Sequence, residues 1–263
     1  MRALKRDMTG DDVVKVNGSL IELGYDIKGE LYNFGMETEI AVRIFQETSN
    51  LEVDGIVGKM TMRELERCEM RWGANKVKVV DTLIEVNYLS QRDNEEHPNG
   101  TCGLTSLAMV LKHLGEKTTR RDQLEDELYE DITSDKAIKH FKSWFPSLQN
   151  YNPWNVHGML VWVAEQRGYS AKFTDKATWT EISEVLRSGT PVIMSGAFTG
   201  AGHIVLLVGL AANGDLIVHD PWGDWGQGYR NKNGAYRIYG YNECNRIMKY
   251  TPFAKLAHFI RRK

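Results

Sequence analysis

The feature that most constrains the fold of this chain is a pair of hydrophobic runs joined by Asn213-Gly214. The runs His203–Leu210 and Leu216–His219 are rich in Val, Ile and Leu, which is typical of buried strands. Asn-Gly between two such runs predicts a β-hairpin. A third run, Pro191–Ser195, precedes them and predicts another strand. The second half of the chain is therefore expected to contain an antiparallel sheet.

Helical patterns come before these strands. Apolar residues recur at helical spacing over Cys102–Leu114, and Gly115 follows as a stop signal. A shorter helix is predicted over Trp179–Arg187, and a strand over Val79–Tyr88. Because helices come first and strands later, the pattern favours an α+β fold over an alternating parallel one.

The first 70 residues differ from the rest in pattern and charge. Apolar residues recur at helical spacing in three short segments, about residues 11–23, 37–48 and 59–67. Residues 1–70 hold nine Lys or Arg against 14 Asp or Glu, net −5, whereas the remainder holds 24 against 21, net +3. We therefore predict a three-helix domain over 1–70, a linker over 71–80 and a second domain over 81–263.

The N-terminal segment resembles the peptidoglycan-binding domain found at the ends of many cell-wall hydrolases. The motifs that match, across residues 3–66, are Gly10-Asp11-Asp12-Val13, Leu23-Gly24-Tyr25, Thr38 with Ala41-Val42, Phe45-Gln46, and Leu51 to Gly58 with Thr61. One loop, Lys28–Gly35, is longer than in the family and lacks its usual aspartate. The resemblance implies bacterial peptidoglycan as the partner, with a purely structural or docking bundle as the alternative.

Composition narrows the other classes of function. The net charge is −2 and no basic block is interleaved with aromatics, so we expect no nucleic-acid partner. No apolar run is long enough for a membrane span, and the N-terminus has no apolar core of the kind a signal peptide needs. The protein is therefore expected to be made in the cytoplasm, without membrane insertion.

Of the three cysteines, Cys102 has the most distinctive setting. It lies in Asn99-Gly100-Thr101-Cys102-Gly103, at the start of the predicted helix. The positive end of a helix dipole and its free amides favour the thiolate, which is the nucleophilic form. A buried, inert cysteine is the alternative, and we expect it for Cys68 and Cys244. The spacing of the histidines predicts no metal site, and no cofactor is expected.

The predicted hairpin brings a base and an acid together. With a four-residue loop, Ala211 to Gly214, residue 205 lies opposite residue 220 and His203 lies opposite Trp222. His203 and Asp220 then share one face of the sheet as diagonal neighbours. A tighter two-residue turn would keep both on one face but further apart. Asp220 could orient His203 toward Cys102, as in a catalytic triad.

Four segments together resemble the papain-like peptidases that include the double-glycine leader peptidases of bacteriocin exporters. They are Ser90-Gln91-Arg92-Asp93, Thr101-Cys102-Gly103 with the residues to Val110, Gly202-His203-Ile204-Val205, and Val218 to Gly223. The resemblance spans about residues 83–225. It implies that Cys102 is the nucleophile, His203 the general base and then acid, and Asp220 the group that orients His203.

The same resemblance implies an oxyanion hole formed by Gln91 with the backbone amide of Cys102. The loop Glu95–Pro98 is longer than in the exporter peptidases, so Asn99 is kept as a second candidate donor. The candidate substrate contacts are Gly103, Gly202 and Trp222. The segment Trp225–Tyr241 either borders the substrate cleft or forms a surface hairpin.

Together the two halves predict a peptidoglycan hydrolase that cleaves amide bonds of wall peptides, as an endopeptidase. The same triad could instead serve an N-acetylmuramoyl-L-alanine amidase. Two further alternatives are a non-catalytic wall-binding protein with a degenerate peptidase fold and a leader-peptide processor. The absence of a signal peptide fits a monomeric bacteriophage endolysin, held in the cytoplasm until a holin releases it to the cell wall.

Overall fold

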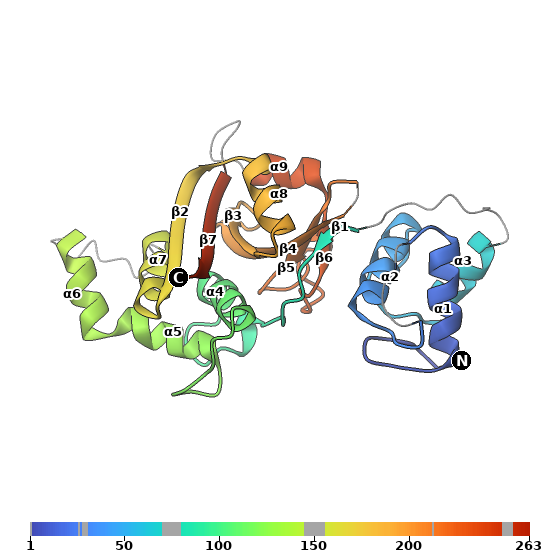
Figure 1. The fold of residues 1–263 in the computed structure, drawn as a ribbon, viewed down its shortest axis with the longest axis horizontal. Coiled ribbons are helices and arrows are strands. Elements are labelled where there is room, and N and C mark those ends of the chain that lie inside the picture. Colours follow the sequence, from blue (N-terminus) through green and yellow to red (C-terminus); the bar gives the residue numbers. More distant parts are fainter. Residues whose placement is uncertain are drawn as a thin grey trace. The chain divides into compact units, whose positions relative to one another are not determined.

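The computed structural model describes residues 2–25, 27, 31–69, 80–144, 156–211, 213–248 and 255–263 (Figure 1). The chain forms two compact units, Met1–Asp81 with Ala211–Asp215, and Thr82–Leu210 with Leu216–Lys263. Of the predicted linker, residues 71–79 lie outside the described residues. Val80, its last residue, is the first residue of a strand. Residues 28–30 of the long N-terminal loop lie outside the described residues as well.

The N-terminal unit is built on three helices: α1 (Asp11–Glu22), α2 (Met36–Thr48) and α3 (Lys59–Glu69). Their apolar faces meet in one core that includes Val16, Leu20 and Phe45. Leu4 pairs with Val57 in an isolated antiparallel bridge, so the chain before α1 is tied to the loop before α3. The three predicted helices are confirmed to within two residues at their ends.

The buried side chain of Gln46 explains why several motif residues of this unit occur together. Its Nε2 donates to Asp54 Oδ1 at 2.8 Å, to Ile56 O at 2.9 Å and to Thr61 Oγ1 at 3.1 Å. Its Oε1 accepts from the amides of Asp54 and Gly55. A buried amide is tolerated when its donors and acceptors are satisfied in this way. One side chain thus fixes the loop that leads into α3.

The C-terminal unit contains a sheet in the order β2-β7-β3-β4-β5-β6, with β1 paired to β4. The strands are β1 (Val80–Leu83), β2 (Tyr169–Ala177), β3 (Val192–Gly196), β4 (His203–Ala211), β5 (Leu216–His219), β6 (Arg237–Tyr239) and β7 (Lys255–Arg262). The pairings along this order are antiparallel. The expected α+β class with an antiparallel sheet is therefore confirmed.

The helices of this unit pack either on the sheet or on one another (Figure 1). They are α4 (Cys102–His113), α5 (Leu124–Thr133), α6 (Asp135–Trp144), α7 (Val156–Gln166), α8 (Trp179–Arg187) and α9 (Tyr241–Ile247). α7 contacts β2 and β7, whereas α4 and α8 both contact β3. Nine of the twelve residues of α4 are buried, among them Leu107 and Leu111, so this helix is held firmly on both sides of its axis.

The hairpin between β4 and β5 differs from the prediction at its turn and agrees with it at the other end. Leu210 pairs with Leu216 and Ala211 N donates to Asp215 O at 2.8 Å, so the predicted four-residue loop is wrong. An irregularity between Leu207 and Gly209 absorbs one residue. Beyond it Leu206 faces His219, which is the register that was expected next to His203 and Asp220.

The acidic first turn of α5 supports the loop that precedes Cys102. Asp126 Oδ1 accepts from the amide of Glu95 at 3.1 Å. Its neighbour Glu125 is 2% exposed, and its Oε2 has no hydrogen-bond partner. Burial raises the pKa of Glu125 to about 7, while the charge of Lys112 partly opposes the shift. Glu125 is thus a buried acid whose pKa lies near neutral pH.

Replacing this acid by its amide, Glu125→Gln, is expected to stabilise the protein more at pH 8 than at pH 5. The folded state binds a proton at Glu125 between pH 4.5 and about 7 that the unfolded state releases. The free energy of unfolding therefore falls as pH rises through that window, by about 1–3 kcal/mol. Thermal melts should show a small gain in midpoint for the variant at pH 5 and a larger gain at pH 8. An equal gain at both pH values would contradict this.

Candidate active site

A cleft of about 800 Å³ opens on the C-terminal unit. Of the residues predicted from sequence, it is lined by Cys102, His203, Gln91, Trp222 and Gly202, and Asn99 lines it too. Asp220 is fully buried behind the cleft. Gly103 is buried within α4 and is not among the described lining residues, so no contact with a substrate is indicated for it.

Cys102 is the first residue of α4 and is partly exposed in the cleft. Its neighbour Thr101 makes no side-chain cap on the helix. The first amides of a helix have no acceptor within it, so they are free to face a ligand, and the helix dipole places partial positive charge there. The thiol thus sits where a negative charge is favoured.

His203 connects Cys102 to Asp220. Its Nε2 donates to Asp220 Oδ1 at 2.7 Å, and both side chains are buried. Since Nε2 is engaged by the carboxylate, Nδ1 is the nitrogen left for Cys102, whose thiol also interacts with the ring. A thiol, an imidazole and a carboxylate therefore lie in a row. In such a row the imidazole can carry a proton to and from the sulfur.

The electrostatics of this arrangement favour a charged imidazole. Burial works against the charged form and lowers the pKa of His203. Hydrogen bonds with Asp220 and Cys102, and the negative charges of both groups, outweigh burial and raise the pKa of His203 to about 9. At neutral pH the imidazole is consequently a cation, held by the carboxylate of Asp220 beside the sulfur of Cys102.

Asp220 is fixed by more partners than the sequence suggested. Its Oδ1 also accepts from Trp222 N at 2.9 Å, and its Oδ2 accepts from the hydroxyl of Tyr239 at 2.8 Å. The backbone carbonyl of Asp220 lies so close to Gly234 that a Cβ there would be 1.8 Å from it. Tyr239 was missed because it lies on β6, a strand of three residues with no clear sequence pattern.

Gln91 is buried beside the cleft in a short 3₁₀ helix, Gln91–Asp93. Its Nε2 donates to Pro98 O at 2.7 Å, and its backbone amide donates to Pro221 O at 3.0 Å. An amide nitrogen carries two hydrogens, so one N–H of Gln91 remains after the hydrogen bond to Pro98 O is made. The long loop Glu95–Pro98 therefore holds Gln91 in place, whereas Asn99 is exposed.

Trp222 and Gly202 both line the cleft. The guanidinium of Arg92 stacks over the indole of Trp222 at 3.5 Å from the ring centroid, and its Nε donates to Trp222 O. Gly202 has φ +83°, a conformation that favours glycine. None of the described lining residues comes from Trp225–Tyr241. That segment instead contacts Asp220 and His203 from outside the cleft.

The histidine that ends β5 has a structural role. His219 is fully buried; its Nε2 donates to Val86 O at 2.8 Å, and its Nδ1 accepts from Tyr236 N at 3.1 Å. Cys244 is buried and Cys68 lies in the N-terminal unit, where it is partly exposed. Neither cysteine shares the setting of Cys102.

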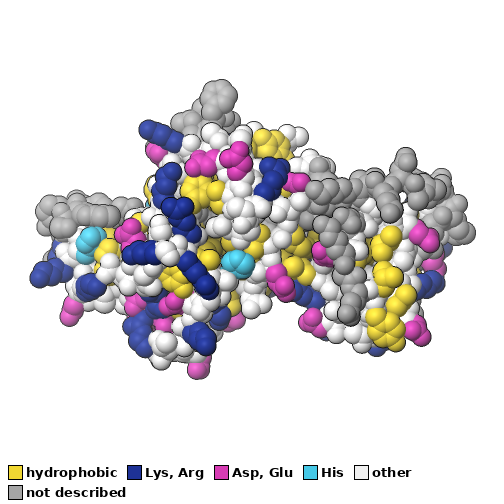
Figure 2. Space-filling model, viewed as in Figure 1, with side chains coloured by type: hydrophobic (Ala, Val, Ile, Leu, Met, Phe, Trp, Pro, Cys, Tyr) yellow, Lys and Arg dark blue, Asp and Glu magenta, His cyan; other side chains and the backbone are white. Residues whose placement is uncertain are grey.

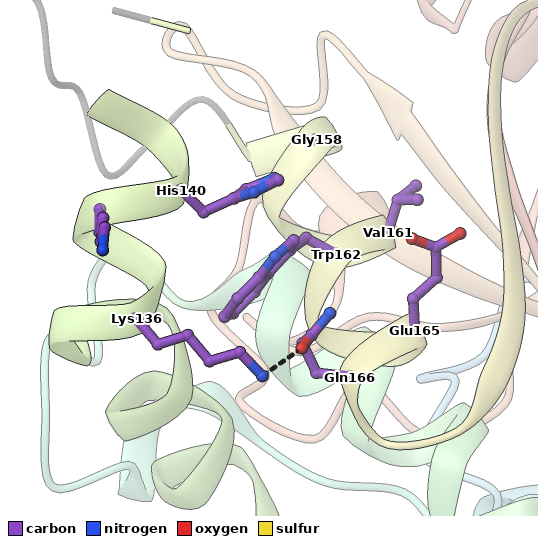
Figure 3. A pocket seen from close by; sticks show the side chains of 8 residues that line it. Lys136, His140, Gly158, Val161, Trp162, Glu165 and Gln166 are labelled. Carbon is purple, nitrogen blue, oxygen red and sulfur yellow. Dashed lines mark hydrogen bonds between the residues drawn. The ribbon is translucent and has the colours of Figure 1, made fainter. Parts of the chain in front are cut away.

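A second cavity, of about 490 Å³, lies between α6 and α7 (Figure 3). His140 stacks against Trp162 with ring centroids 5.6 Å apart, and Lys136 donates to Gln166 at 2.5 Å. The side chains that line it include neither a cysteine nor a serine. The row of thiol, imidazole and carboxylate described above therefore belongs to the first cleft.

Comparison with known protein families identifies the family of the C-terminal unit. Residues 83–247 match the Peptidase_C39-like family. The chain belongs to the Peptidase_C39-like family. Residues 9–65 match the family described as "Putative peptidoglycan binding domain". A search of curated proteins found no match. The pairing of these two domains suggests a cell-wall peptidase.

Parts of the chain are similar to several solved structures. The peptidase domain of Streptococcus ComA, a bifunctional ABC transporter, is 16% identical, with 68% of this chain and 100% of that chain covered and a TM-score of 0.45. A C39-like peptidase from Bacillus anthracis is also 16% identical, at 70% and 98% coverage and a TM-score of 0.45. The SleB N-terminal domain is 32% identical over 26% of this chain and 93% of that chain, with a TM-score of 0.25.

Within the described residues, no helix is long and apolar enough to cross a membrane. On the face shown in Figure 2, acidic and basic side chains are interspersed over the C-terminal unit. Among the described residues of the N-terminal unit, the exposed large apolar side chains are Leu31 at 45%, Tyr32 at 53% and Met60 at 67%.

Proposed function

We propose that this protein hydrolyses amide bonds in the peptides of bacterial peptidoglycan, as a cysteine endopeptidase. The observation that carries the proposal is the contact of His203 with both Cys102 and Asp220 at the wall of an open cleft. The N-terminal match to a peptidoglycan-binding domain supports the choice of substrate. Such a module holds the enzyme on an insoluble polymer and raises the local concentration of scissile bonds.

In the proposed reaction, the Cys102 thiolate attacks the carbonyl carbon of the scissile amide. The imidazolium of His203 then gives its proton to the leaving amine, and an acyl-enzyme remains on the sulfur. Neutral His203 next takes a proton from water, which attacks the thioester and releases the carboxylate product. Asp220 keeps the imidazole oriented and stabilises its charge throughout.

The developing oxyanion needs two donors in the cleft. We assign the second N–H of Gln91 and the backbone amide of Cys102 to this role. Gln91 is favoured over Asn99 because the hydrogen bond to Pro98 O holds its amide in a buried position. A donor fixed before the reaction needs no reorganisation when charge appears, so it contributes more than a mobile one.

The proposed source is a bacteriophage, in which such an enzyme acts as an endolysin and waits in the cytoplasm for a holin. The exposed apolar side chains Leu31, Tyr32 and Met60 are candidates for contact with the wall. Exposed apolar surface often marks a site of interaction. This assignment predicts binding of the intact protein to sedimented wall.

The deciding experiment is digestion of purified peptidoglycan by the intact protein, with the fragments analysed by mass spectrometry. New amino termini inside the stem or cross-bridge peptides would support the endopeptidase. New amino termini only at muramic-linked alanine would replace it by an amidase. A double-glycine leader peptide, tested in parallel, separates both from a leader processor. Binding to wall with no cleavage of either substrate would leave a non-catalytic wall-binding protein.

A further inference from the structure

Tyr229 lies in a closed loop between the 3₁₀ helix Trp225–Gln227 and β6. Its backbone is left-handed, with φ +61°. A residue other than glycine is strained there and keeps the conformation only where its contacts impose it. The loop is closed at its base, since Tyr229 N donates to Asp224 O at 2.7 Å and Asp224 N donates to Asn231 O at 3.0 Å. These bonds fix the direction of the Tyr229 side chain.

The ring of Tyr229 borders the imidazole of His203. The two rings are nearly perpendicular, at 84°, with centroids 6.0 Å apart. Phe198 contacts the same imidazole in the same way, at 6.3 Å and 87°. His203 is therefore enclosed by two aromatic rings in addition to its polar partners Asp220 and Cys102.

The hydroxyl of Tyr229 gains little from this position. It is buried and makes no well-formed hydrogen bond, although it interacts with the carboxylate of Asp220. Burial raises the pKa of Tyr229, and the negative charges of Asp220 and Cys102 raise it further, so the phenol stays neutral. A buried hydroxyl without a well-formed hydrogen bond is unfavourable, and so is the backbone strain. Both are tolerated together at one residue, which indicates that the ring is what the site requires.

We propose that Tyr229 is a positioning residue, whose ring keeps water away from the His203–Asp220 hydrogen bond and holds the imidazole toward Cys102. The inference rests on the proposed thiol mechanism. Charged hydrogen bonds are stronger where water is excluded, because the local dielectric constant is lower. Removal of the ring should thus weaken the hydrogen bonds that Asp220 and Cys102 make with protonated His203.

The charged groups around this site are few and can be named. Asp220 follows β5, Cys102 begins α4, and the hydroxyl of Tyr239 on β6 donates to Asp220. Asp224, at the base of the loop, is paired with Arg237 at 3.3 Å. Substitution of Tyr229 removes no charge from this set. A change in the titration of His203 would therefore report the entry of water.

The test compares the intact protein with Tyr229→Phe and Tyr229→Gly. Phenylalanine keeps the ring, and glycine removes it while accepting the left-handed backbone without strain. One readout is kcat/KM on peptidoglycan across pH. The other is the rate of Cys102 alkylation by iodoacetamide across pH, followed on the Cys102 peptide by mass spectrometry because Cys68 and Cys244 are also free.

Tyr229→Phe should match the parent within about twofold, whereas Tyr229→Gly should lose roughly 10- to 100-fold in kcat/KM. The alkaline limb of the activity profile, near pH 9 in the parent, should move to lower pH in Tyr229→Gly. The direction follows because the partners of His203 outweigh its burial. When water replaces both influences, the pKa of His203 returns toward its ordinary value.

Unchanged limbs in Tyr229→Gly would overturn the inference even if activity fell, since lost packing alone moves no titration. An equal shift in Tyr229→Phe would overturn it in favour of the hydroxyl. If Tyr229→Gly does not fold, Tyr229→Asn also fits the left-handed backbone and admits water, and the same shift is expected. If the parent's Cys102 alkylates as an ordinary thiol, the proposed function fails instead, whatever the variants do.

Discussion

Replacement of Cys102 by alanine is expected to lower peptidoglycan hydrolysis at least about 10⁴-fold while leaving wall binding intact. The loss is large because the sulfur forms the acyl-enzyme, and no other described nucleophilic side chain in the cleft contacts His203. The measurement is the release of new amino groups from purified wall, with sedimentation of protein and wall as the binding assay.

The matched controls for Cys102→Ala are Cys68→Ala and Cys244→Ala. Cys68 lies in the N-terminal unit and Cys244 is buried in α9, so both variants should keep the parent rate. Cys102→Ser keeps a nucleophilic atom of poorer reactivity and should be nearly as inactive as alanine. Hydrolysis by Cys102→Ala at the parent rate would rule out the thiol mechanism.

The second large effect is expected for His203→Ala, with a loss of about 10²- to 10⁴-fold. Cys102 then lacks both the cation beside it and the donor for the leaving amine. Its alkylation by iodoacetamide should rise only at the alkaline pH where an ordinary thiol ionises. In the parent, alkylation should be fast at neutral pH, because His203 stays protonated up to about pH 9.

His219→Ala tests whether this effect is specific. His219 is fully buried and makes hydrogen bonds with Val86 O and Tyr236 N, so its loss should lower the melting temperature. The pH profile of Cys102 alkylation should nevertheless stay that of the parent in whatever fraction is folded. If His203→Ala and His219→Ala gave the same profile, the assignment of His203 as the base would be wrong.

The elements predicted correctly from the sequence are those with a regular or continuous pattern of apolar residues. α4 has apolar residues on a regular face, and β4 and β5 are continuous apolar runs, so all three were placed to within about a residue. The approach of His203 to Asp220 followed from the register of that pair. The register was right near the site although the turn was wrong, because the irregularity between Leu207 and Gly209 offsets the one-residue shift in pairing at the turn.

Elements with weak patterns were missed. β2 alternates little and carries Lys172 and Lys176, and β6 has only three residues. β7 ends in charged residues and pairs with strands far away in sequence, which no local pattern indicates. The partners Tyr229 and Tyr239 were missed for the same reason, since their contacts with His203 and Asp220 depend on the tertiary fold.

The position of β7 has a consequence for the time at which the protein becomes active. Residues 255–262 lie between β2 and β3, so the sheet has a gap until this stretch of chain has been made. β3 leads into β4, whose first residue is His203, and α4 packs on β3. A ribosome-bound chain that ends before β7 is therefore expected to carry Cys102 and His203 without aligning them. The order of synthesis would thus delay activity until translation has passed the last strand.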